Sequence, residues 1–214
     1  MKTVLLFYPR LLKANWRWLV LSGCVFVVGL AMGCVVYTLF PDMVNKLLEN
    51  SFSSLSQIAL ELEKLSFLQQ VWMILRQNVI VVSIMLITGV FFGVFPFLLL
   101  FSNSFFIGVL GGISVGKMSS ELFFSALAPH AFFELPALFI VAAWGMKLGH
   151  RTFLLVTSPF RQKQKYKNIG AEWQNTFNEC GYIWLLVVLL LIVAAFIEIG
   201  VSYRLVQGAV NTGL

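Results

Sequence analysis

The segment from Trp18 to Phe40 contains no charged side chain. As a helix of about 23 residues it would be about 34 Å long, which is enough to cross a hydrocarbon core of about 30 Å. Other apolar runs follow it, and 11% of the residues are charged, against about 25% in a typical soluble domain. A soluble protein of 214 residues could not bury so much apolar surface. The sequence therefore predicts an all-α, polytopic transmembrane helix bundle.

Charge and proline divide the chain into five parts. The residues before the first apolar run are apolar on one side and basic on the other, which predicts an interfacial helix bent at Pro9; a plain flanking tail is the alternative. After the run, a polar segment repeats apolar residues at spacings of four and three, typical of an amphipathic helix, and a further helix from about Phe67 to Gln77 leads into the next span. We expect an interfacial helix at 1–17, a first span at 18–40, an outer amphipathic segment at 41–78, a core of four spans at 79–203 and a tail at 204–214.

The core is expected to hold spans at 79–101, 129–149 and 181–203. Residues 105–115 are too short to cross a membrane alone, so we interpret them as a thin or broken crossing that residues 122–128 complete. If they only dipped into the bilayer, the basic loop at 150–170 would lie outside, against the bias of lysine and arginine toward the cytoplasm. Five crossings predict a multi-pass protein of the cell membrane with a cytoplasmic N-terminus and an external C-terminus.

Basic and glycine residues indicate what this bundle contacts. The basic loop carries Arg151, Arg161, Lys163, Lys165 and Lys167. Anionic headgroups of the lipid bilayer are its simplest partner, and a cytoplasmic protein is the alternative. Glycines four residues apart let helix backbones approach closely and also permit a homodimer. The helix-packing glycines are predicted to be Gly29, Gly33, Gly89, Gly93, Gly108, Gly112, Gly116, Gly145 and Gly149.

Polar side chains are expected to meet inside the membrane at the head of the span 129–149. The residues of this polar intramembrane cluster are predicted to be Asn103, His130, Glu134 and Glu198. A proline lacks a backbone donor, so we expect a regular helix to begin near Pro136 and residues 130–135 to be irregular. Ionisable residues at membrane depth are costly, which makes them candidates for function.

Several uses of the cluster are consistent with these residues. They could form a polar clasp between helices, or line a proton-relay or transport path. Catalysis would need a nucleophile, a base and an orienting group, and a metal site would need a second cluster of ligands; neither is legible. We therefore expect no enzyme activity, no metal and no cofactor. The basic residues flank apolar runs rather than a soluble module, which argues against nucleic acid.

Three strings resemble a known family. HAFFELPALFIVAAWGMKLGHR resembles the signature of the stage II sporulation protein M family of integral membrane proteins, in which a histidine and a phenylalanine-glutamate-x-proline-alanine run open a membrane helix. FSNSFFIGVLGG and AAFIEIGVS resemble the family's asparagine-glycine element and its last span. The resemblance covers about Val79 to Tyr203. Ala131 and Ser104 stand where the family usually has glycine.

This resemblance implies a non-enzymatic membrane protein. The namesake of the family resembles an anchor for peptidoglycan-degrading partners during engulfment in sporulating bacteria, and other relatives resemble membrane components encoded with ATP-binding cassette proteins. We therefore expect a scaffold or assembly subunit for membrane or envelope proteins. The alternative is a component of a transport or export system that works with an ABC-type ATPase through a polar intramembrane path. A membrane hydrolase is the third hypothesis.

Overall fold

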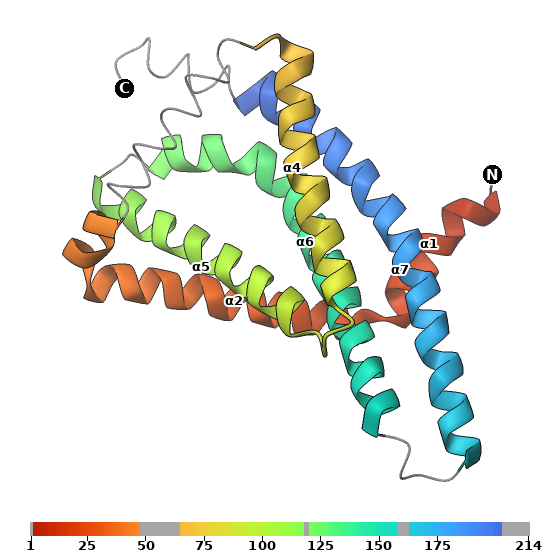
Figure 1. Cartoon of the computed structure of the whole chain (residues 1–214). Coiled ribbons are helices and arrows are strands. Elements are labelled where there is room, and N and C mark those ends of the chain that lie inside the picture. Colours follow the sequence, from red (N-terminus) through yellow and green to blue (C-terminus); the bar gives the residue numbers. More distant parts are fainter. Residues whose placement is uncertain (1, 48–64, 118–119, 158–162, 203–214) are drawn as a thin grey trace.

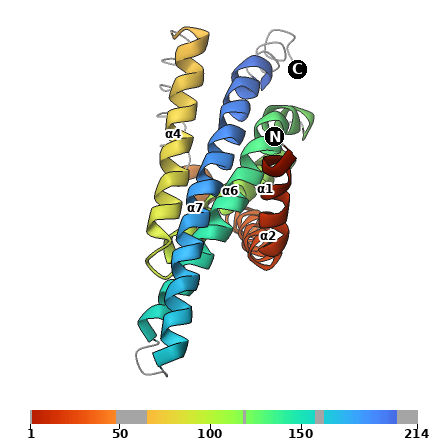
Figure 2. The ribbon, with the colours of Figure 1, turned by 90° about the vertical axis from the view of Figure 1, so that its right-hand side faces the viewer.

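A long helix, α6 (Ser120–Thr157), lies at the centre of the computed structural model, and the other helices pack around it (Figure 1, Figure 2). The structure describes residues 2–47, 65–117, 120–157 and 163–202, with side chains for 7–47, 65–113, 134–157 and 168–200. Every residue of α6 from Val141 to Gly149 is buried. Because this stretch faces protein on all sides, it can carry a charged side chain that a lipid-facing helix could hold only at great cost.

The described residues form helices joined by turns, with no strand among them. They are α1 (Lys2–Ala14), α2 (Trp16–Leu39), a short helical stretch at 41–47, α4 (Phe67–Thr88), α5 (Val94–Lys117), α6, α7 (Lys163–Ile197) and a π-helical turn, η2 (Glu198–Ser202). The segments Trp16–Leu39, Phe67–Thr88, Val94–Ile113 and Asn168–Gly200 are long and apolar enough to cross a membrane. The predicted all-α, polytopic fold class is confirmed.

α2 and α5 lie side by side and run in the same direction (Figure 1). A Cβ atom added at Gly29 would lie 2.8 Å from the carbonyl oxygen of Phe101, and one at Gly33 would lie 2.9 Å from the amide nitrogen of Val109. From the α5 side, an added Cβ would meet α2 equally closely at Gly108 and Gly112. Real Cβ atoms do not approach other atoms to these distances, so the contact as it stands excludes a side chain at Gly29 or at Gly33.

The predicted span at 79–101 is instead the junction of two helices. α4 ends at Thr88 and α5 begins at Val94, and the chain reverses between them with Phe92 at φ 56° and Gly93 at φ 73°. Residues 79–101 carry no charge in either helix or in the turn between them, so apolar composition cannot reveal the reversal. Gly89 and Gly93 therefore belong to a turn, not to one face of a single helix.

This turn packs on α6. A Cβ atom added at Gly89 would lie 2.8 Å from the Cα atom of Gly145, and one at Gly93 would lie 3.0 Å from the Cα atom of Met146. An added Cβ at Gly149 would overlap the backbone of Gly93. Gly116, which we also predicted to pack, lies in α5, but its packing falls outside what the structure describes.

The junction corrects the prediction of a short crossing at 105–115. α5 begins at Val94 and has 24 residues, so it is about 36 Å long and could span a bilayer alone. Residues 122–128, which we expected to complete that crossing, belong to α6.

The segment at 130–135, predicted to be irregular, is helical. α6 continues through Pro129 and Pro136, and Figure 1 shows its first turns at a marked angle to the rest of the helix. A proline removes one backbone hydrogen bond and pushes against the preceding turn, which can bend a helix without ending it. The two prolines therefore bend α6 and do not delimit it.

Most of the predicted basic loop at 150–170 is also helical. α6 extends to Thr157 and α7 begins at Lys163, well before the predicted start of the last span at 181. We call residues 147–157 of α6 and 163–179 of α7 the α6/α7 hairpin; the end of α6 and the start of α7 pass beyond the α4–α5 turn (Figure 1). Hydropathy marks where a helix leaves the apolar phase and not where the helix itself ends. The spans predicted from hydropathy were therefore shorter than α6 and α7.

The structure places helices at the N-terminus and in part of the outer segment, while the interfacial position of the first and the outer position of the second stay predictions. α1 is helical through Pro9, and the ring of Phe7 packs edge-on against Tyr182 of α7, with 5.2 Å between ring centroids. α4 begins at Phe67, as expected, and the backbone N–H of the preceding Ser66 donates a capping hydrogen bond of 2.9 Å to the side-chain oxygen of Gln69. The predicted amphipathic face of the outer segment falls on residues 48–64, which lie outside the described residues.

Candidate functional site

Glu134 of α6 is one of the ionisable residues that the sequence singled out, and it is 6% exposed. Its carboxylate accepts a hydrogen bond of 2.6 Å from the side-chain amide of Asn78, which lies midway along α4. A buried carboxylate is costly unless polar groups replace its water. The contact with Asn78 meets part of that requirement and ties α4 to α6 at a central depth.

The other members of the predicted cluster are placed differently. Asn103 is exposed on α5 and does not join Glu134, which corrects our prediction. Glu198 is half-buried in η2, and η2 packs against α6, α7 and α4. The side chain of His130 lies outside the described residues. Among the residues that the structure describes, Asn78 takes the place that we had assigned to Asn103.

A second polar contact lies at the base of the α6/α7 hairpin. Lys147 of α6 and Glu179 of α7 form an ion pair of 2.5 Å, and their side chains are 8% and 15% exposed. The indole nitrogen of Trp144 donates a hydrogen bond of 3.0 Å to the same carboxylate oxygen, Oε2 of Glu179. Trp144 is itself completely buried. Both charges are therefore withdrawn from solvent but neutralise each other.

Further along the hairpin, the same two helices exchange contacts that are more exposed. Arg151 pairs with Glu172, whose side chain is 53% exposed. The indole nitrogen of Trp173 donates a hydrogen bond of 2.9 Å to the hydroxyl of Thr152. Together with the Lys147 contact, these are three ties between α6 and α7. They hold the two helices in one register from the buried base toward the exposed end.

Each of these polar contacts joins two helices, and none of them presents a free reactive group. The ammonium group of Lys147 is engaged by a carboxylate, so it is not a free base or nucleophile. Glu134 does not line the cavity of about 910 Å³ that the described side chains of α4 and α7 form. Within the described residues, no group of three or more histidine, cysteine, aspartate or glutamate side chains could hold a metal ion. The arrangement fits a polar clasp at two depths of α6.

Sequence reasoning missed the residues that make these contacts. Lys147 interrupts an apolar run, and Glu179 stands at the head of the next one. Opposite charges at those two places are a signal that the last two long helices pair antiparallel, since charges inside a membrane protein usually pair with each other. Asn78 carried no such signal, because only the packing of α4 on α6 brings it to Glu134.

Comparison with known proteins places the described contacts within one family. Residues 22–203 match the family described as Stage II sporulation protein M. The chain is also similar to an uncharacterized protein of Methanocaldococcus jannaschii, with 30% identity over 133 residues, which cover 62% of the chain and 70% of that protein. No solved structure matches the chain. The family match spans both polar contacts of α6.

Proposed function

This chain belongs to the stage II sporulation protein M family of membrane proteins, which is not a known enzyme family, and from that premise we propose that it is a non-enzymatic scaffold for other membrane or envelope proteins. The single observation that carries the proposal is the α6/α7 hairpin, which passes beyond the α4–α5 turn (Figure 1). It offers a surface that the rest of the bundle does not cover.

The hairpin is suited to receive a partner because it is held in shape from within. Three ties between α6 and α7 fix the register of the two helices. A surface that is ordered before binding loses less conformational entropy when a partner arrives. In the sequence, basic residues follow the end of α6 and open α7, and their charge would favour an acidic partner surface. These residues are Arg161, Lys163, Lys165 and Lys167.

We propose that the N-terminus and the hairpin lie in the cytoplasm and that the C-terminus lies outside. Pairs of contacts give the helix directions: α2 runs parallel to α5 and antiparallel to α6, and α6 runs parallel to α4 and antiparallel to α7. Five crossings would give this alternation, with α2 and α5 steeply inclined to α4 (Figure 1), and the choice of side is proposed from charge. The basic residues of 1–17 and of the hairpin then share one side, as the positive-inside rule expects.

Charge reversal at the end of the hairpin tests the scaffold. We expect the quadruple variant Arg161→Glu, Lys163→Glu, Lys165→Glu and Lys167→Glu to lose the proteins that co-purify with the tagged chain from its native membranes. The glycine contacts and the ties are unchanged, so the variant should keep its unfolding temperature. Glu134→Gln, a matched polar change inside the bundle, should keep its partners. Equal recovery of partners by the quadruple variant and by the wild type would contradict the proposal.

Transport with an ABC-type ATPase is the second candidate, and two carboxylates favour it. Glu134 lies at the depth of the middle of α4, and Glu198 begins a π-helical turn, a rare geometry that is frequent at functional sites. If the chain forms a path, Glu134→Gln should stop the flux of the transported species while a co-purified ATPase is retained. Loss of neither flux nor partners would leave the scaffold as the better account.

We also propose that two copies can pair through α5. Asn103 is exposed near the centre of the segment Val94–Ile113, where lipid offers its amide no hydrogen bond. A two-fold axis beside Asn103 would let each amide donate to the other. Energy transfer between labelled copies in vesicles should fall for Asn103→Leu. It should persist for Ser102→Leu, since the hydroxyl of Ser102 already donates to the carbonyl of Leu98 at 2.6 Å.

The glycine faces are proposed to serve as packing surfaces within the chain. An added Cβ would meet α5 closely at Gly29 and Gly33, whereas Gly23 on the same helix has no atom within 4 Å of an added Cβ. The difference supports a packing role for the glycines that face α5.

A further inference from the structure

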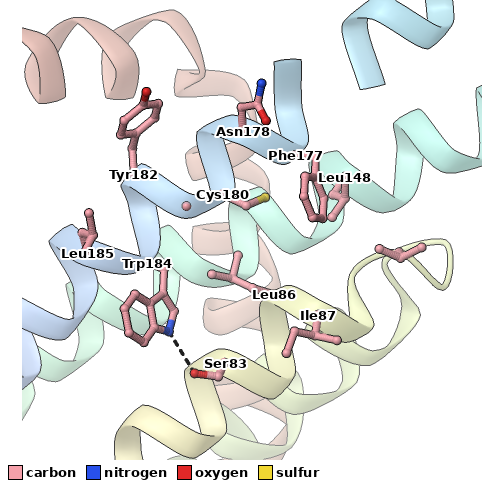
Figure 3. Close-up of a pocket in the computed structure, with 12 residues that line it drawn as sticks. Ser83, Leu86, Ile87, Leu148, Phe177, Asn178, Cys180, Tyr182, Trp184 and Leu185 are labelled. Carbon is pink, nitrogen blue, oxygen red and sulfur yellow. Dashed lines mark hydrogen bonds between the residues drawn. The ribbon is translucent and has the colours of Figure 1, made fainter. Parts of the chain in front are cut away.

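A groove of about 910 Å³ lies between α4 and α7, on the face of the bundle that includes Gly181 (Figure 3). Leu86 and Ile87 line it from α4, and Cys180 and Leu185 line it from α7. Both helices are long and apolar enough to cross a membrane, so this part of their surface would face lipid. The volume falls in the range of about 300–1,000 Å³ that is typical of ligand pockets.

The groove is closed at one end. The indole nitrogen of Trp184 donates a hydrogen bond of 2.9 Å across the groove to the hydroxyl of Ser83 (Figure 3). Beyond this bridge the helices stay in contact, since the rings of Phe67 and Phe196 lie 6.2 Å apart. In the other direction α4 ends at Thr88 while α7 continues. The groove therefore opens toward the α4–α5 turn and is blind at the Trp184–Ser83 bridge.

Gly181 gives the groove part of its depth. An added Cβ at this glycine would have no atom within 4 Å, so the residue is not needed for a close approach of helices. Glycine inside a helix costs about 1 kcal/mol relative to alanine, a cost that Gly33 and Gly108 offset through packing. At Gly181 no packing offsets it. What the missing side chain leaves is room between α4 and α7.

We propose that this groove binds one acyl chain of a membrane phospholipid, drawn from the leaflet on the side of the α4–α5 turn. A flexible chain can enter an apolar notch that is open at one end while its headgroup stays at the membrane surface. A partner helix is a rod about 10–12 Å wide and would need a seam along the whole of α4 and α7. The Trp184–Ser83 bridge interrupts that seam. The inference depends on membrane insertion and not on the scaffold proposal.

Native mass spectrometry of the full chain, released from nanodiscs of phosphatidylethanolamine and phosphatidylglycerol, tests the proposal. We expect the wild type to retain one phospholipid. Gly181→Leu should fill the groove without a clash and lower that occupancy about tenfold, the effect of about 1.4 kcal/mol. Gly23→Leu is the matched control, because it adds the same side chain to α2 where an added Cβ also has no atom within 4 Å. It should leave the occupancy unchanged.

A second variant approaches the groove from the opposite wall. Ile87 is 70% exposed on α4, so Ile87→Trp should add bulk to the groove without disturbing the core and should also release the lipid. If Gly181→Leu does not fold, the outcome for Ile87→Trp decides. Equal lipid retention by the wild type and by the folded groove variants would overturn the proposal. So would a wild type that retains no lipid, or one that is released as a dimer which Gly181→Leu makes monomeric.

Discussion

The α2/α5 pair and the α6/α7 hairpin join helices in opposite ways. α2 and α5 meet through glycines, and the described contact between them contains no charged side chain. Its polar groups stay within the backbone or bond to it, as when the thiol of Cys34 donates to the carbonyl of Gly108 at 3.2 Å. α6 and α7 instead exchange two ion pairs and two indole hydrogen bonds.

The difference follows the surroundings of each pair. Lipid offers no hydrophobic drive for helices to associate, so close van der Waals contact between bare backbones is an effective glue there. α6 is enclosed by other helices near Lys147, and the end of the hairpin passes beyond the α4–α5 turn (Figure 1), so charged side chains can pair without facing acyl chains. α2 and α5 are therefore held by close backbone packing at glycines. α6 and α7 are held by ion pairs, one buried and one exposed.

The largest loss of hairpin stability is expected when one buried charge is left without its partner. Glu179→Leu leaves the ammonium group of Lys147 buried without its carboxylate, and removal of one partner of a buried pair costs about 3–5 kcal/mol. We expect a loss of that size in the free energy of unfolding, measured by denaturant titration in detergent micelles. Adding Lys147→Met should restore most of the stability. If the double variant is no more stable than Glu179→Leu, the charge pairing is not what matters.

The α2/α5 pair should break through bulk and not through charge. Gly108→Leu places a side chain against the backbone of α2 at Leu30, and overpacking of this kind costs typically about 1–3 kcal/mol, with the upper end expected here because backbone atoms are met. Gly111→Leu, on the same helix, meets no atom within 4 Å and should be close to neutral. Thermal unfolding of both variants, followed by size-exclusion chromatography, measures the contrast. Equal losses in the two would contradict it.

Between these extremes lies the contact of α4 with α6. Asn78→Leu removes the amide that donates to the carboxylate of Glu134, and hydrogen bonds to charged groups contribute about 1.5–3 kcal/mol. We expect a loss of about 2 kcal/mol in the free energy of unfolding. Gln77→Leu is the control, since Gln77 is the exposed neighbour on the same helix. A smaller loss for Asn78→Leu than for Gln77→Leu would show that the contact does not stabilise the bundle.

The smallest effect is expected at the exposed end of the hairpin. Glu172→Gln weakens the pair with Arg151, and exposed ion pairs contribute about 0.2–1 kcal/mol. Salt screens such pairs, so the difference from the wild type should shrink between low and high ionic strength. The stability cost of Glu179→Leu should depend on salt much less. If salt changed the stability cost of Glu179→Leu as strongly as that of Glu172→Gln, the two ion pairs would not differ in their exposure to solvent, against the proposal.

Part of this arrangement was predictable from residues alone. The uncharged run from Trp18 to Phe40 became α2 within two residues, because a long apolar run has one stable form in a bilayer. Glu134 was predicted to be sheltered from lipid because an ionisable residue at membrane depth is costly, and it is 6% exposed; its functional role stays a prediction. The error at 79–101 arose because an apolar turn and an apolar helix have the same hydropathy. The exposure of Asn103 depends on how α5 rotates against α2, and no local pattern records that rotation.

By itself the sequence determined that this protein is a bundle of apolar helices with a few costly polar residues, because hydropathy, charge and length are properties of each segment taken alone. Only the tertiary structure decided which polar groups meet. Asn78 reaches Glu134, and Lys147 reaches Glu179, because glycines and turns set the distance and direction between helices. Those are relations between distant segments, and a low dielectric makes each of them matter.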